Sequence, residues 1–158
     1  MHGMVNIAVR AARRAGELMI RQLNHLEALE VTEKNHNEYV TEVDYRAEEA
    51  IIEVIYDHYP DHAILAEERG QQGSNEFQWI IDPLDGTGNY VHGVPYFAVS
   101  IAMEYQGELA VAVVLDPSHD ELFTAVRGRG TRLNGTPLSV SALSVTDLDT
   151  ALVTASLP

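Results

Sequence analysis

The segment from Trp79 to Asn89 reads Trp-Ile-Ile-Asp-Pro-Leu-Asp-Gly-Thr-Gly-Asn, and no other part of the chain says more about fold and chemistry. Its first residues are apolar and predict a buried strand over residues 78–81. That strand delivers two carboxylates, Asp82 and Asp85, to one tight turn, where a hydroxyl and two glycines follow. The segment therefore predicts a strand that ends in a group of polar side chains.

A second acidic pair, Glu67-Glu68, follows another apolar run, for which we expect a strand over residues 63–66. If the two strand ends lie side by side, several carboxylates converge on one point. Because like charges at close range repel one another, such an arrangement requires a cation. Hard oxygen ligands without a thiolate favour Mg²⁺, which usually completes its shell with water and substrate phosphate.

Each of these acids also has a purely structural explanation. Asp-Pro and Asp-Gly are ordinary turn dipeptides, and a lone pair of glutamates at a strand end is commonly surface charge. Asp44 fits a capping box with Thr41, and sequence physics alone favours that role. A turn does not require the Gly-Thr-Gly of residues 86–88 after its acids, however. With this loop beside it, Glu67 is favoured as a cation ligand, and Glu68 is left open.

The residues after Asp85 also predict an anion site. Gly86 and Gly88 let backbone N–H groups approach a phosphate, and a short helix starting near Thr87 would add a favourable dipole. One loop could then supply both metal ligands and a phosphate cradle. The spacing does not fit an EF-hand, which needs acids at alternate positions. It does not fit a P-loop either, because Val94-Pro95 stands where Lys-Ser/Thr is required.

Composition narrows the possible functions. The chain has 158 residues, 46% hydrophobic content and a formal net charge of −14, which predicts one folded domain and argues against a general nucleic-acid binder. It holds no cysteine, which excludes a thiolate metal site and suits the reducing cytoplasm. The chain start has no apolar signal core, and the longest apolar run, residues 109–115, is too short to span a bilayer.

The hydrophobic pattern predicts two helices followed by strands. Apolar residues recur at helical spacing from Val5 to Leu26 and from about Thr41 to His58, with a polar connector over residues 29–37. Helices followed by consecutive hairpins indicate an α+β domain over residues 1–158, in which two helices pack on a largely antiparallel sheet. The expected strands are 63–66, 78–81, 97–105, 109–115, 121–126 and 151–154, with turns at 128–130 and 134–135.

These motifs resemble those of the inositol monophosphatase family of Mg²⁺-dependent, lithium-sensitive phosphatases, and most closely its bacterial extragenic-suppressor branch. The matching elements are Val-Thr-Glu-Val-Asp at 40–44, Leu-Ala-Glu-Glu at 65–68, and the segment from Trp79 continuing to Ala102. The resemblance runs from the N-terminus to the last residue. It implies the N-terminal half of a layered α/β/α/β/α sugar-phosphatase fold, in a family that is usually dimeric.

The resemblance also implies a role for each site residue. Glu67, Asp82 and the Leu84 carbonyl would hold one Mg²⁺, and Asp82 and Asp85 would share a second. Thr87, hydrogen-bonded to Asp44, would orient a metal-bound water, and these two residues form the catalytic set with Glu67. The phosphate would lie against Leu84, Asp85, Gly86, Thr87 and Gly88, of which Gly86 and Thr87 present backbone N–H groups.

The chain departs from the family pattern at two points. Gly88 stands where the family usually has a second threonine, and this glycine loosens the loop. The family's second α/β domain carries a Trp-Asp element that completes the second metal site and contacts the sugar, and nothing in this chain matches it. We therefore expect either an incomplete chain or a natural half-length relative.

Two functions from different classes follow. The first is a Mg²⁺-dependent phosphomonoesterase that hydrolyses inositol monophosphate or a similar polyol phosphate. The alternative is a regulatory binding module with little or no activity, acting on RNA polymerase or antitermination factors, with which the suppressor branch is associated. A bisphosphatase relative ranks below both, because Asn89-Tyr90 resembles the monophosphatase form of the loop. We expect no membrane partner and no direct nucleic-acid partner.

Overall fold

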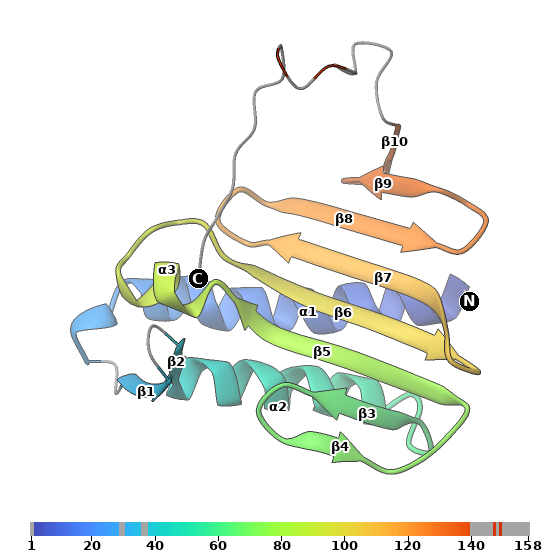
Figure 1. Cartoon of the computed structure of the whole chain (residues 1–158), viewed down its shortest axis with the longest axis horizontal. Helices are drawn as coiled ribbons and strands as arrows, with labels where there is room; N and C mark the ends of the chain where they lie inside the picture. Colours follow the sequence, from blue (N-terminus) through green and yellow to red (C-terminus); the bar gives the residue numbers. More distant parts are fainter. Residues whose placement is uncertain (1, 29–30, 36–37, 140–146, 148, 150–158) are drawn as a thin grey trace.

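The computed structural model describes residues 2–28, 31–35, 38–139, 147 and 149. Two long helices, α1 (His2–Leu23) and α2 (Glu42–Tyr56), lie side by side on one face of an eight-stranded sheet (Figure 1). The predicted α+β fold, with helices packed on a largely antiparallel sheet, is confirmed.

The sheet has the spatial order β10-β9-β8-β7-β6-β5-β3-β4. Within it, neighbouring described strands are antiparallel except β3 and β5, which are parallel. This one parallel pair matters, because both of its strands end at the same edge of the sheet. The strands are β3 (Ala63–Ala66), β4 (Gly70–Gln72), β5 (Phe77–Asp85), β6 (Ala98–Tyr105), β7 (Glu108–Asp116), β8 (Glu121–Val126), β9 (Thr131–Leu133) and β10 (Thr136–Leu138).

The core lies between the helices and the sheet. Every second residue of β6, and of β5 as far as Ile81, points toward the helices, as the pleat of a strand requires. Helix α1 presents mainly alanines to this core, and these small side chains allow close approach to α2 and the sheet. The buried residues of these elements include Ala8, Ala11, Ala12, Ala15, Met19, Ile51, Ile55, Trp79, Ile81, Val99, Ile101 and Met103.

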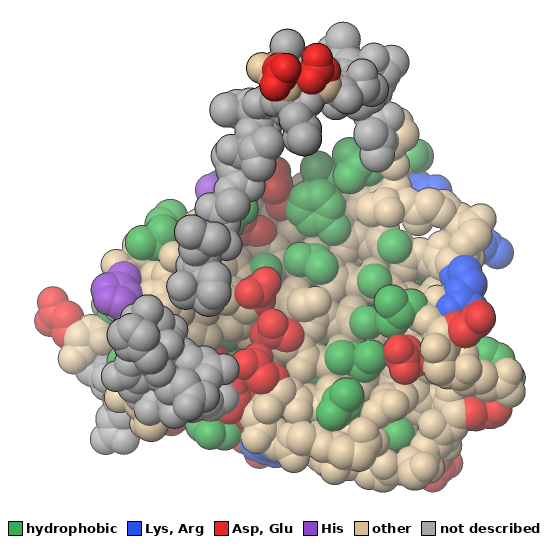
Figure 2. Space-filling model, in the orientation of Figure 1, with side chains coloured by type: hydrophobic (Ala, Val, Ile, Leu, Met, Phe, Trp, Pro, Cys, Tyr) green, Lys and Arg blue, Asp and Glu red, His purple; other side chains and the backbone are tan. Residues whose placement is uncertain are grey.

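The opposite face of the sheet is covered by no helix within the described ranges, and Figure 2 shows this face. Leu65, Ile80, Ala102 and Ala112 lie opposite one another on four neighbouring strands and form an apolar row. Leu65 is 40% exposed. The middle of this face is therefore apolar, and acidic side chains gather on it toward the end of β5.

Several sequence predictions differ from the structure. The strand predicted at 78–81 is longer, because β5 runs on to Asp85, so Asp82 and Asp85 lie in a bulged strand end and not in the predicted tight turn. The polar stretch 29–37 was predicted to be a connector, and this was wrong: β1 (Val31–Asn35) pairs antiparallel with β2 (Glu38–Thr41). A polar hairpin has no apolar alternation to reveal it, and β4 was missed for the same reason. Helix α1 begins and ends three residues before the predicted 5–26, and a 3-10 turn, η1 (Leu26–Ala28), follows it.

The remaining predicted elements agree with the structure or fall outside it. The strand expected at 121–126 is β8, the hairpin expected at 97–115 is β6 with β7, and the turn at 134–135 joins β9 to β10. The strand expected at 151–154 lies outside the described residues. None of the described helices is long and apolar enough to cross a membrane.

Candidate active site

Glu67 and Asp82 come together because β3 and β5 are parallel neighbours. The register pairs Ala66 with Ile81, and the Glu67 amide donates to the Ile81 carbonyl oxygen at 3.1 Å. The two side chains are close enough to share a hydrogen bond. Burial is the main cause that raises the pKa of Asp82 to about 7, and the charges of Glu67 and Asp85 add to it.

A bulge near the end of β5 brings Asp85 to the same side of the sheet as Asp82. Asp82 lies opposite Ser100 and Asp85 opposite Ala98, so three steps along β5 match two steps along β6. In a regular strand, residues three apart point to opposite faces, but one extra residue reverses that relation. Both acids therefore lie on the face turned away from the helices, where Figure 2 shows the acidic group.

Asp44 connects the start of α2 to the loop after β5. Its Oδ2 accepts hydrogen bonds from the Thr41 amide at 2.8 Å and the Thr41 hydroxyl at 2.7 Å, and its Oδ1 accepts one from the Thr87 hydroxyl at 3.0 Å. The capping box and the contact with Thr87 are thus both present. Burial raises the pKa of Asp44, while the hydrogen bonds from Thr41 and Thr87 oppose that rise.

The Thr87 hydroxyl has a single proton and two acceptors within reach. Besides Asp44, it can donate to the Leu84 carbonyl oxygen at 2.9 Å. Whichever acceptor takes the proton, lone pairs remain on the hydroxyl to accept a hydrogen bond from a water. The Leu84 carbonyl also has two lone pairs, so its contact with Thr87 leaves one available to a cation.

The two glycines of the loop are not equivalent. Gly86 precedes the short helix α3 (Thr87–Val91) with a φ of 86°, and a Cβ there would lie 3.0 Å from the Tyr96 carbonyl oxygen. Only glycine suits that position. A Cβ on Gly88 would meet only the Tyr39 ring, at an ordinary 3.7 Å. Gly86 is therefore required by the backbone, and Gly88 is not.

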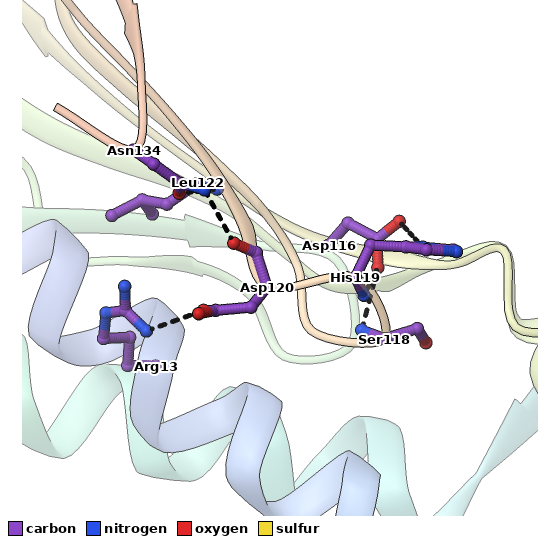
Figure 3. Close-up of polar contacts among 7 residues, drawn as sticks. All are labelled: Arg13, Asp116, Ser118, His119, Asp120, Leu122 and Asn134. Carbon is purple, nitrogen blue, oxygen red and sulfur yellow. Dashed lines mark hydrogen bonds and ion pairs between the residues drawn. The ribbon is translucent and has the colours of Figure 1, made fainter. Parts of the chain in front are cut away.

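A cavity of about 360 Å³ opens beside Asp85 and Gly86. Asp116 belongs to its wall and also holds the β7–β8 loop, as Figure 3 shows: its Oδ1 accepts from the amides of Ser118 at 2.8 Å and His119 at 3.0 Å. Sequence reasoning missed Asp116, Glu121 and Phe123, because these residues come from β7 and β8, which carry no local motif. The other lining residues are Asn89, Tyr96, Phe97, Ala98, Glu121 and Phe123.

The residues present fit a hard divalent cation. Asp82 Oδ1 is buried without a hydrogen-bond partner, and the neighbouring Glu67 carboxylate adds oxygen ligands of the same kind. No group of three or more His, Cys, Asp or Glu side chains in the described part of the chain has metal-binding geometry. The side chains alone thus offer two carboxylates in contact, and Mg²⁺ characteristically keeps several water ligands beside one or two carboxylates.

The structure therefore brings most of the predicted site residues together. Glu67 contacts Asp82, Asp85 lies on the same side of the sheet, and Thr87 bonds to both Asp44 and the Leu84 carbonyl. Glu68 was left open, and its amide donates to Glu48 Oε2 at 2.8 Å. Glu48 had not been considered from the sequence, because one glutamate within an acidic helix gives no signal.

Comparison with known proteins gives consistent matches. The model of the inositol monophosphatase family matches residues 1–158. The Nus factor SuhB of Pseudomonas aeruginosa is 55% identical over 145 residues, which are 89% of this chain and 54% of that protein. The Nus factor SuhB of Escherichia coli K12 is 48% identical over 160 residues, covering 100% of this chain and 59% of that protein. The chain thus spans little more than half the length of these relatives.

Solved structures give the same picture. The extragenic suppressor protein suhB of Bartonella henselae superposes with a TM-score of 0.86 at 39% identity, over 89% of this chain and 55% of that one. The Thermotoga maritima IMPase TM1415 gives a TM-score of 0.81 at 33% identity, over 90% of this chain and 55% of that one. The described fold is therefore shared with both proteins.

Proposed function

The chain belongs to the inositol monophosphatase family, and from this premise we propose that its acidic site serves Mg²⁺-dependent hydrolysis of inositol monophosphate or a similar polyol phosphate. The observation that carries the proposal is the parallel pairing of β3 with β5, which sets Glu67 against Asp82. Two carboxylates in contact are unfavourable unless a proton or a cation lies between them. A pair of carboxylates that a cation can stabilise suits phosphate chemistry, in which the cation also neutralises charge on the phosphoryl group.

The ligands would be Glu67, Asp82, Asp85 and the Leu84 carbonyl oxygen. A bound divalent ion supplies Lewis acidity, which makes water a nucleophile near neutral pH and neutralises charge on the phosphoryl group. The protein's own contribution is to fix these oxygens in place. The bulge of β5 does so for Asp85, and the β3–β5 register does so for Glu67.

Thr87 and Asp44 would orient the attacking water. Asp44 holds the Thr87 hydroxyl at 3.0 Å, and Asp44 is itself fixed by two hydrogen bonds from Thr41. With its proton turned toward Asp44, the hydroxyl presents a lone pair that accepts a hydrogen bond from water. A fixed acceptor of this kind lowers the entropic cost of bringing nucleophile and phosphorus together.

The phosphate would lie against the loop of residues 84–88. Tyr90 is the first residue of α3 that donates back to the loop, to the Gly86 carbonyl at 3.0 Å. The earlier amides of Thr87 and Gly88 belong to the first helical turn, where N–H groups have no partner within the helix. Gly86, whose backbone only glycine tolerates, keeps this approach clear of a side chain.

The test measures phosphate release from inositol 1-phosphate with Mg²⁺, together with Mn²⁺ binding by electron paramagnetic resonance. We expect Asp82→Asn to abolish both and lithium to inhibit release. Asp57→Asn is the matched control. Asp57 is exposed at the C-terminal end of α2, roughly 20 Å along the helix from Asp44, which lies beside the site. Equal rates and equal Mn²⁺ binding in the wild type and Asp82→Asn would eliminate the assigned site.

A second candidate function is a regulatory binding module, and the names of the matching relatives favour it. The proteins from Pseudomonas aeruginosa and Escherichia coli are both called Nus factors. In this role the chain would bind RNA polymerase or antitermination factors and hydrolyse little. Capture of these components from a bacterial extract, unchanged by Asp82→Asn and accompanied by no phosphate release, would favour the module over the enzyme.

The proposal includes a cytoplasmic location and a homodimer, both of which the family resemblance implies. Sedimentation of the purified chain tests whether it forms a homodimer. A single species at 17.5 kDa would contradict it.

A further inference from the structure

Glu48 is a buried carboxylate that the proposed chemistry does not use. It lies on α2 one turn after Asp44, and it is 0% exposed. Its Oε2 accepts a hydrogen bond from the Glu68 amide at 2.8 Å, whereas its Oε1 has no hydrogen-bond partner. The nearest described cation is Arg69, whose Nε lies 3.5 Å from Oε1 and whose side chain is 40% exposed.

A buried carboxylate of this kind lowers the stability of the fold. Burying a carboxylate costs several kcal/mol unless its oxygens are well paired, and an apolar side chain of similar volume is often as stable or more so. Glu48 has one good hydrogen bond from the Glu68 amide, a weaker one from the Arg69 amide and one long ion pair, and burial still raises its pKa. A role in stability alone is a poor explanation for a carboxylate at this position.

Glu48 binds the backbone directly after Glu67, the residue whose side chain contacts Asp82. The Glu67 amide is bonded to Ile81 on β5, and the next amide, that of Glu68, is bonded to Glu48 on α2. The peptide groups on both sides of the Glu67 Cα are therefore fixed. The direction in which the Glu67 side chain leaves the backbone, toward Asp82, depends on these two bonds.

Helix α2 thus supports both halves of the site from one face. Asp44 holds the loop after β5 through Thr87, and Glu48, four residues later, holds the turn after β3 through Glu68. Residues four apart are neighbours on a helix surface. The spacing of the two loops is consequently set by a rigid element rather than by the loops themselves.

We propose that Glu48 is a positioning residue, which holds Glu67 against Asp82 by accepting the Glu68 amide and so raises the affinity of the site for a divalent cation. This inference rests on the proposed function, since it concerns the same pair of carboxylates. It assigns a physical task to a side chain that touches neither the cation nor the substrate.

The test measures Mn²⁺ affinity in the full chain with two substitutions that differ in one property. Glu48→Gln keeps an acceptor oxygen for the Glu68 amide and should bind Mn²⁺ within about threefold of the wild type. Glu48→Met keeps the volume but removes the acceptor, and its affinity should fall about 10- to 100-fold, the usual effect of losing a group that orients a ligand. In the metal-free Glu48→Met protein, the gain from no longer burying a carboxylate offsets the loss of an acceptor for the Glu68 amide, so the unfolding temperature should change little.

Two further measurements keep the outcomes separate. Ile52→Val, one turn further along α2 and also buried, removes packing without removing an acceptor and should leave Mn²⁺ affinity unchanged. In the wild type, the Glu68 amide should exchange with solvent more slowly than the amide of Gly107 in the exposed β6–β7 turn. This exchange measurement needs no variant, so fast exchange would overturn the inference even if Glu48→Met does not fold.

The inference is overturned if Glu48→Met binds Mn²⁺ like the wild type, or if Glu48→Gln loses as much affinity as Glu48→Met. Fast exchange of the Glu68 amide overturns it as well. The proposed function fails differently, through a wild type whose Mn²⁺ binding is absent or insensitive to Asp82→Asn.

Discussion

Strand β5 begins in an aromatic cluster and ends in a carboxylate cluster, and these two ends have opposite effects on the stability of the fold. At its start, the ring of His62 stacks between Tyr59 and Phe77 at centroid distances of 4.7 and 4.8 Å, and the Trp79 indole donates to His62 Nδ1 at 3.1 Å. At its end, Asp82 Oδ1 is buried without a partner beside the carboxylate of Glu67.

The aromatic end stabilises the fold, whereas the carboxylate end serves the proposed function at a cost in stability. The aromatic end combines apolar burial, ring stacking and a satisfied indole N–H, all of which favour the folded state. The carboxylate end brings like charges together and buries a polar atom, which opposes folding in the absence of a cation. Substitutions at the two ends should therefore move stability in opposite directions.

The largest effect is expected from Asp82→Asn. Loss of this ligand should lower phosphate release on the order of 10⁴-fold, or about 5.5 kcal/mol in activation free energy. The same substitution removes a like charge from Glu67 and supplies an amide donor to it, so the metal-free protein should gain about 1 kcal/mol in the free energy of unfolding. Urea denaturation at pH 7.5 with a chelator measures that gain, and a loss there would break the comparison.

At the aromatic end, Trp79→Ala should destabilise the chain by about 3–5 kcal/mol, because it leaves a cavity in the core. Trp79 is fully buried. Trp79→Phe is the control, since it keeps a ring against Tyr59 but loses the indole N–H to His62, and it should cost about 1–2 kcal/mol. Circular dichroism must follow the unfolding, because this is the only tryptophan in the chain.

The two glycines beyond β5 sharpen the comparison within a single loop. Gly86→Ala forces a side chain into a left-handed backbone and against the Tyr96 carbonyl, which should cost about 2–3 kcal/mol. Gly88→Ala should change stability by less than about 0.5 kcal/mol. We also expect Gly88→Thr to leave phosphate release unchanged or raised, and a large fall would show that Gly88 is more than a tolerated departure from the family pattern.

The sequence predicted the segments that carry a strong periodic signal. The two helices, the β6–β7 hairpin and β8 follow from the spacing of apolar residues, and the link between Thr87 and Asp44 follows from the family resemblance. The β1–β2 hairpin and β4 did not follow, because polar strands at a sheet edge lack alternation. Pairing, rather than composition, makes them strands.

Long-range placement explains what was missed at the site. The contact of Glu67 with Asp82 was expected, but its cause was not, because the hydrophobic pattern does not reveal that β3 and β5 run parallel. Asp116 reaches the cavity from the end of β7, and Glu48 reaches the Glu68 amide from the middle of α2. Neither belongs to a motif, since each acts through an element distant in the chain.

The smallest expected effect is a difference in how stability depends on pH. Burial lowers the pKa of His62 below its ordinary 6.5, so the unfolded chain binds more protons there and stability falls as the pH drops below that value. Asp82 has the opposite sign: its pKa is raised from 3.8 to about 7, so its folded form keeps a proton and stability falls as the pH rises through 7.

The two slopes have opposite signs below pH 6.5 and partly cancel in the wild type, each reaching at most about 1.4 kcal/mol per pH unit. With divalent ions chelated, Asp82→Asn should shift the profile toward stability that rises with pH, because it removes the opposing slope of Asp82 and leaves that of His62. His62→Asn keeps an oxygen acceptor for the Trp79 indole without a titrating ring, and it should shift the profile toward stability that falls as the pH rises. Parallel urea-denaturation profiles in the two variants would mean that the ends of β5 do not differ in the way their contacts imply.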